Sequence, residues 1–128
     1  MFDSLDIFQT ATAMARHAGA RQAIVAQNIA NADTPGFQAQ AIAPFSETYQ
    51  STGATQMRTT RSGHVSGSAI GVAQVELAAA GSEPAPNGNT VSLEEELLNS
   101  VAISREHDRA LAVYRHAMTV LRTTLGRS

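Results

Sequence analysis

The chain has 128 residues, enough for one domain, and carries a formal net charge of −2. It has no basic run that could follow nucleic-acid phosphates, and it has no cysteine for thiolate catalysis or disulfide bonds. Its aromatic residues are four Phe and two Tyr, with no Trp. Because aromatic side chains make the largest single burials in a core, we expect a thin core and helices that bury small faces against each other or against other chains.

The first residues do not resemble a secretory signal or a membrane span. Asp3 and Asp6 stand where a positive segment and an apolar stretch should be, and the first basic residue is Arg16. No run approaches the ~18 apolar residues that a spanning helix needs. A role outside the cytoplasm would therefore require export without a cleavable signal peptide.

Residues 4 to about 31 are predicted to form the first long helix. Asp3 or Ser4 is placed to cap its start. Pro35 disfavours helix at the preceding residue, and Gly36 follows, so the helix should stop before them. At ~1.5 Å per residue it would be roughly 40 Å long. Steps of three and four residues define its apolar stripe: Phe8, Ala11, Ala15, Ala18, Gln22, Val25 and Ile29.

Residues 38–90 have a different composition, dominated by Gly, Ser, Thr, Ala, Gln and Pro. Such a segment buries too little apolar surface to offset its ordering entropy, so we expect it to be flexible or ordered only by neighbours. Partial alternation over residues 70–77 could form a short strand. Residues 80–89 read as a loop.

The last helix is predicted over residues 92–125. Ser92 and Glu95 have the spacing of a capping box, the acidic run 94–96 suits a helix N-terminus, and Gly126 can serve as the stop. Several large side chains follow a heptad-like seam that is interrupted by Ser100 and His107. We expect this assembly seam to pack against other chains; its residues are Leu93, Leu97, Leu111, Tyr114, Met118, Leu121 and Leu125.

The predicted fold is therefore mainly α, with two long terminal helices pairing as a hairpin or coiled coil. The chain divides into residues 1–37, a flexible middle segment 38–90 that could hold a short β element, and residues 91–128. The first and last parts should form one structural unit.

A signature turn follows the first helix. Asn31 and Asp33 can bond local backbone groups, Pro35 stiffens the chain, Gly36 permits positive φ, and Phe37 offers an apolar anchor. From the residues alone, an ordinary helix-stop loop remains an open interpretation. The residues of this signature turn are Asn28, Asn31, Asp33, Thr34, Pro35, Gly36 and Phe37.

The string from Asn28 to Phe37, NIANADTPGF, resembles the signature of the axial proteins of the bacterial flagellum. Within that group the chain is most similar to the proximal-rod (FlgB) type, because it is short and carries Gly-Asn-Thr-Val-Ser-Leu at residues 88–93. The resemblance covers roughly residues 4–45 and 86–125. Another short rod protein remains an alternative within the family.

This resemblance implies a structural subunit whose terminal helices assemble into the helical, torque-transmitting tube of the basal-body rod. It implies a position in the periplasm-spanning rod and export through the flagellar type III apparatus. The implied partners are other rod proteins, the MS-ring/rod junction protein and copies of the chain itself. Phe37 is followed four residues later by Ala41 and then by Ile42, an imperfect match to an export-gate motif, so no export residue is assigned.

No residue set predicts catalysis, a cofactor or a metal ion. His107 and His116 are nine residues apart on the last helix, a spacing that does not make an i, i+4 metal pair, and His17 and His64 lie elsewhere. We expect the histidines to have surface or packing roles. A runner-up of a different class is a small helical adaptor or secretion chaperone, which would fold alone as a discrete dimer.

Overall fold

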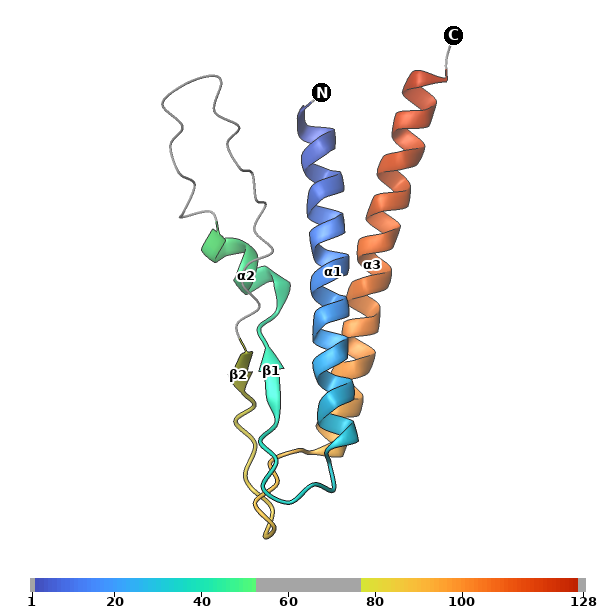
Figure 1. Cartoon of the computed structure of the whole chain (residues 1–128). Helices are drawn as coiled ribbons and strands as arrows, with labels where there is room; N and C mark the ends of the chain where they lie inside the picture. The colour runs from blue at the N-terminus through green and yellow to red at the C-terminus, as the bar shows by residue number, and fades with distance from the viewer. Residues whose placement is uncertain (1, 53–76, 127–128) are drawn as a thin grey trace.

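The computed structural model describes residues 2–52 and 77–126. Two long terminal helices dominate it, which confirms the predicted mainly α fold. They run antiparallel, lie side by side where the signature turn leaves the first helix, and separate toward their free termini (Figure 1). In chain order the elements are α1 (Phe2–Ala30), β1 (Gln40–Ile42), α2 (Phe45–Thr52), β2 (Leu77–Ala79) and α3 (Leu93–Leu125).

Both helices end where local signals predict, with small differences. Helix α1 includes Phe2, so Asp3 and Ser4 lie inside its first turn and do not precede it as caps. Ser92 caps α3 by accepting a hydrogen bond from the Glu95 backbone N–H at 3.5 Å. The Glu95 side chain accepts from the Ser82 hydroxyl at 3.3 Å, so only the first half of the predicted capping box forms. Gly126 closes α3 with its N–H on the Arg122 carbonyl at φ −87°, without a left-handed conformation.

The α1–α3 interface is narrow and built mostly from small side chains. Its core consists of Ala18, Val25 and Ile103, with Ile29 packed against it. The predicted α1 stripe does face this interface, because Ala11 is also buried and the other stripe residues are half-buried. Burying a Val or Ile side chain is worth about 1.5–3 kcal/mol, so this core stabilises the helix pair only modestly.

Polar and aromatic pairs fix how the two helices lie along each other. The Arg21 guanidinium contacts the Glu106 carboxylate at 2.7 Å. The Gln22 amide donates to the Ser100 hydroxyl at 2.9 Å. Ser100, which interrupts the apolar seam of α3, therefore has a polar partner on α1. Nearer the free termini, the rings of Phe8 and Tyr114 meet edge to face at 5.2 Å.

The middle segment lies beside α1. Strands β1 and β2 pair antiparallel, with Gln40 opposite Ala79 and Ile42 opposite Leu77. The sequence pattern predicted neither β1 nor α2. Of the strand expected over residues 70–77, only Leu77 falls within the described residues, where it begins β2.

Helix α2 packs on α1 through a histidine. The ring of Phe45 lies edge to face against His17 at 5.6 Å, and His17 is only 5% exposed. Burial, assisted by nearby Arg21 and opposed by Glu106, lowers the pKa of His17 below its usual value. This neutral, buried ring has the packing role expected for it.

Candidate functional site

The signature turn adopts the conformation that its residues predict. Gly36 has φ +72°, in the left-handed region that glycine tolerates and other residues rarely adopt. The Asn31 side-chain amide donates to the Gln27 carbonyl at 2.8 Å, and the Thr34 hydroxyl donates to the Asn31 side-chain oxygen at 3.3 Å. Asp33 and Pro35 are exposed, and no hydrogen bond of the Asp33 carboxylate occurs among the described residues. Asn31 therefore makes the local bond expected of it, whereas Asp33 does not.

The turn is held by Asn89, which lies more than 50 residues later in the chain. Its side-chain amide nitrogen lies 2.9 Å from the Asn31 carbonyl oxygen and 2.8 Å from those of Ala32 and Thr34. Its side-chain oxygen accepts from the Val91 backbone N–H at 2.7 Å. Asn89 is 3% exposed. One buried amide thus contacts three carbonyl oxygens of the turn that follows α1 and holds that turn against the return segment.

Backbone contacts join the same two segments, which we call the signature turn (residues 28–37) and the return segment (residues 85–92). The Gly36 N–H donates to the Asn87 carbonyl at 3.0 Å, and the Thr90 N–H donates to the Phe37 carbonyl at 3.0 Å. Gly88 also has a positive φ of 79°, and a Cβ placed there would lie 3.5 Å from the Gly36 Cα. The two glycine backbones therefore face each other closely.

A second buried amide connects three elements at the base of the helix pair. Asn28, 1% exposed, donates from its side-chain nitrogen to the Gln40 carbonyl at 2.7 Å and to the Glu96 carboxylate at 2.9 Å. Its side-chain oxygen accepts from the Gln40 N–H at 3.1 Å. Asn28 lies on α1, Gln40 on β1 and Glu96 on α3, so a single side chain sets the relative positions of all three elements.

Glu96 does more than place charge at a helix N-terminus. It is 5% exposed, and its second carboxylate oxygen has no hydrogen-bond partner among the described residues. Burial raises the pKa of Glu96, the hydrogen bond from Asn28 partly opposes that rise, and Glu95 adds to it. In the sequence Glu96 looks the same as its acidic neighbours Glu94 and Glu95, but in the fold Glu96 is buried and the other two are exposed.

Glu96→Gln is expected to stabilise the chain at neutral pH. Because the folded-state pKa of Glu96 is raised, this group stabilises the fold fully below its ordinary pKa and less as the pH rises through that value toward the raised one. Glutamine keeps an oxygen that can accept from Asn28 and stays neutral. The difference in unfolding free energy between variant and parent should therefore grow from pH 4 to pH 7 in denaturant titrations.

The control for this experiment is Glu94→Gln, since Glu94 is exposed and is not among the groups that shift the pKa of Glu96. It should show no such growth with pH. Glu96→Ala removes the acceptor for Asn28 and should cost about 1–3 kcal/mol at either pH. A Glu96→Gln variant that is less stable than the parent at pH 7 would show that the charge is favourable where it lies.

The assembly seam predicted on α3 is divided by the structure. The α3 residues buried toward α1 are Glu96, Ile103 and Ala110, one position before the stripe 97–104–111. The seam residues Leu111, Met118 and Leu121 are half-buried, whereas the others are exposed: Leu93 50%, Leu97 55%, Tyr114 40% and Leu125 74%. Their role in assembly stays a prediction, but Leu93, Leu97 and Leu125 are left available to other chains.

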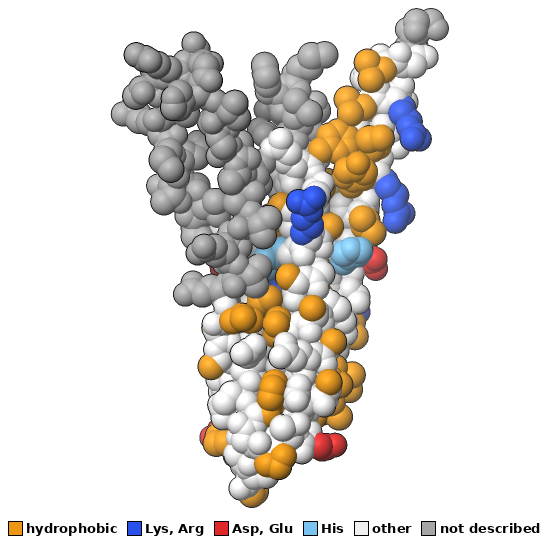
Figure 2. Space-filling view, viewed as in Figure 1, with side chains coloured by type: hydrophobic (Ala, Val, Ile, Leu, Met, Phe, Trp, Pro, Cys, Tyr) orange, Lys and Arg blue, Asp and Glu red, His pale blue; other side chains and the backbone are white. Residues whose placement is uncertain are grey.

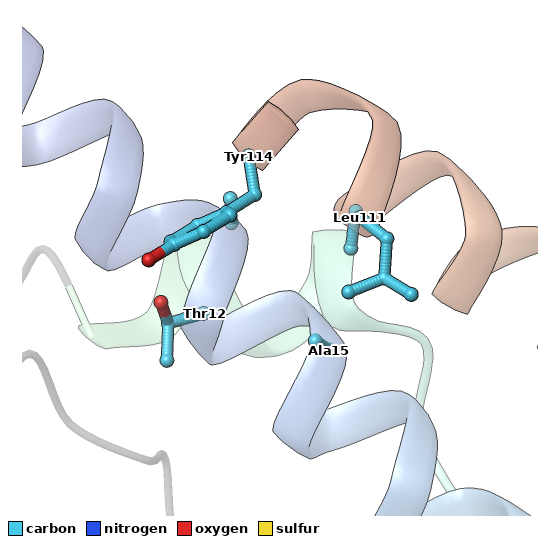
Figure 3. Close-up of a pocket in the computed structure, with 6 residues that line it drawn as sticks. Thr12, Ala15, Leu111 and Tyr114 are labelled. Carbon is cyan, nitrogen blue, oxygen red and sulfur yellow. The ribbon is translucent and has the colours of Figure 1, made fainter. Parts of the chain in front are cut away.

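An apolar groove lies between the helices where they begin to separate. It has a volume of about 270 Å³ and is lined by residues of both helices. Figure 3 shows Leu111 and Tyr114 of α3 projecting toward Thr12 and Ala15 of α1. The remaining lining residues are Ala11 and Ala110. Within residues 2–52 and 77–126, no group of three or more His, Asp or Glu could hold a metal ion, and no helix is long and apolar enough to cross a membrane.

Known proteins are similar to the part of the chain that contains the signature turn. The family model described as "Flagella basal body rod protein" matches residues 9–38, which include most of α1 and the whole signature turn. The Flagellar basal body rod protein FlgB of Agrobacterium fabrum (strain C58) is 33% identical over 112 residues, covering 81% of each chain. The chain belongs to the flagellar basal body rod protein family. The FlgB protein of Salmonella typhimurium (strain LT2) is 35% identical over 101 residues, covering 73% of each chain.

The segment matched by the family model contains the signature turn, and the structure shows that residues outside this segment hold the turn in place. The family match ends at residue 38, so neither Asn89 nor Glu96 lies within the matched segment. The sequence singled out residues 88–93 as a second motif but did not predict that it contacts the first. The available signal was a glycine within turn-forming residues in each segment, Gly36 after Pro35 and Gly88 between Asn87 and Asn89.

Proposed function

We propose that this chain is a structural subunit of the proximal rod of the flagellar basal body, and that its terminal helices assemble into the helical tube that transmits torque. Family membership carries the proposal at the level of a rod subunit. The helix pair supports the assembly mode, because α3 leaves large apolar side chains in solvent: Leu97 at 55%, Leu98 at 67% and Val101 at 52% exposure. Contiguous exposed apolar residues of this kind are typical of interaction surfaces.

The proposed partners are other rod proteins, the MS-ring/rod junction protein and further copies of the chain. Its location would be the periplasm-spanning rod, reached through the flagellar type III export apparatus without a cleavable signal peptide. We propose no enzymatic activity and no cofactor, in keeping with the structural role of the family. The adaptor or chaperone alternative finds no support in the family membership.

Location is tested directly with purified basal bodies. A strain carrying a deletion of the gene should be non-motile, and the epitope-tagged chain should restore swimming and co-purify with the basal body. The tagged chain should remain with the rod after the hook and filament are dissociated. A chain found only in the cytoplasmic fraction, bound to an export substrate, would favour the chaperone alternative and overturn the rod assignment.

The isolated chain is expected to have low helicity in dilute solution. Among the described residues, the core cluster between α1 and α3 is small, with Ala18, Val25 and Ile103 at its centre, and helices with so little burial depend on tertiary packing with other chains. Circular dichroism should show helical content below that of α1 and α3 together and a broad thermal transition, with helicity rising at high protein concentration. A sharp cooperative melt from a monodisperse monomer in size-exclusion chromatography would contradict this expectation.

A further inference from the structure

Arginines are absent from one end of the helix pair and present at the other. We call the end with the signature turn and the start of α3 the closed end, and the end with the free termini the open end. From residue 109 to 125, α3 contains arginines and no carboxylate, and α1 from residue 7 to 30 also has none; Asp3 and Asp6 precede that stretch. Residues 22–52 and 77–104 contain no Arg or Lys. Figure 2 shows arginines beside hydrophobic side chains on upper α3, and acidic side chains at the lower end.

The closed end carries an apolar face with a carboxylate in it. Glu94, Leu97, Leu98 and Val101 have the i, i+3, i+4, i+7 spacing of one helical face. All four are exposed. The α3 residues buried toward α1 are others, namely Glu96, Ile103 and Ala110. We call these four residues the closed-end patch. Nothing in the described part of the chain covers it.

The open end carries the complementary surface. The groove at Thr12, Ala15 and Leu111 is apolar. On α3, Arg115 stands four residues after the groove residue Leu111, and Arg122 stands seven residues after Arg115, so both residues leave the helix near the Leu111 edge of the groove, as Asp108 does two turns earlier. Both arginines are exposed. The groove therefore has an apolar floor and a basic rim.

We propose that the open-end groove receives the closed-end patch of a second copy of this chain, a helix face with leucines beside a carboxylate. This proposal rests on the proposed function. An apolar face fits the groove floor, and its carboxylate meets the arginine rim, which fixes the register of docking. Because patch and groove lie at opposite ends of one helix pair, the contact is head-to-tail, so each bound copy leaves a free groove or a free patch for the next one.

Cysteine crosslinking tests the contact, since the chain has no native cysteine. A second copy of the full chain supplies the closed end as the probe. Leu98→Cys in one copy is mixed at high concentration with Thr12→Cys in another, and a short bismaleimide is added. The control pairs Leu98→Cys with Val113→Cys, which lies on α3 two residues from Leu111 and therefore on another side of the helix. The Leu98–Thr12 pair should crosslink about tenfold more than the control, a difference of about 1.4 kcal/mol.

Charge reversal separates specific docking from general association. Arg115→Glu in the groove partner should reduce the crosslink about tenfold, and adding Glu94→Arg to the Leu98→Cys partner should restore it. Circular dichroism on each variant verifies that helicity matches the parent. Equal crosslinking in the control pair, Leu98–Leu98 pairing, absence of any crosslink, or no rescue by the double reversal would each overturn the proposal. If the parent chain is incorporated normally into basal bodies while any of these results is obtained, the docking contact is wrong and the proposed rod function is unaffected.

Discussion

Asn89→Asp is expected to destabilise the contact between the signature turn and the return segment, and with it the junction between α1 and α3. The two amide hydrogens of Asn89 are shared among three carbonyl oxygens, and a carboxylate oxygen in place of the nitrogen would face the same three acceptors with a negative charge. Loss of a buried donor costs about 1–3 kcal/mol, and a carboxylate charge placed against carbonyl oxygens adds to that cost. Cells that produce this variant should fail to swim, and the purified chain should lose helicity.

The matched control makes the same chemical change two residues away. The Asn87 side-chain oxygen accepts from the Asn89 backbone N–H at 3.0 Å, an interaction that aspartate can also make, and Asn87 is exposed. Asn87→Asp should therefore retain swimming and parental helicity, measured by soft-agar motility and circular dichroism. Equal behaviour of the two variants would mean that the three carbonyl contacts of Asn89 do not hold the signature turn.

Leu121→Asp is expected to leave the protein produced but the rod incomplete. Leu121 is half-buried on α3 beyond Ala110, in the part of α3 where the two helices separate. Burying a leucine is worth about 1.5–3 kcal/mol, and an unpaired charge in an apolar contact adds a desolvation penalty. In a subunit that depends on neighbours for much of its core, the loss should appear as failed assembly. Electron microscopy of basal bodies and motility assays measure the outcome.

The control for Leu121→Asp is Glu83→Gln in the exposed loop before the return segment, which should be nearly silent. Protein levels must match between the two variants for the comparison to hold. Normal swimming with Leu121→Asp would place this part of α3 in solvent within the rod, and the α3 seam would then have no role in assembly.

Local chemistry was enough to predict the two long helices and the turn that joins the first of them to the middle segment. Ser92 caps α3, Gly36 adopts positive φ, and the α1 stripe faces α3, because each depends on residues within one or two helical turns. The short pairing of β1 with β2 and the seating of α2 on His17 were not predicted, since both depend on contacts with α1 rather than on their own weak patterns.

The sequence by itself determined the helices, their ends and the family, because capping, periodicity and the NIANADTPGF string are all read from neighbouring residues. Only the tertiary structure decided which polar groups meet. Asn28 and Glu96 are 68 residues apart, and Asn89 lies 58 residues from Asn31, so no local pattern could pair them. The same holds for α3, where periodicity located the apolar positions but not the side that packs on α1. In the structure, Ile103 and Ala110 are buried with the alanines of α1, whereas Leu97 and Leu98 are exposed. Those leucines remain in solvent because α1 has only one narrow apolar stripe, and one stripe covers one side of α3.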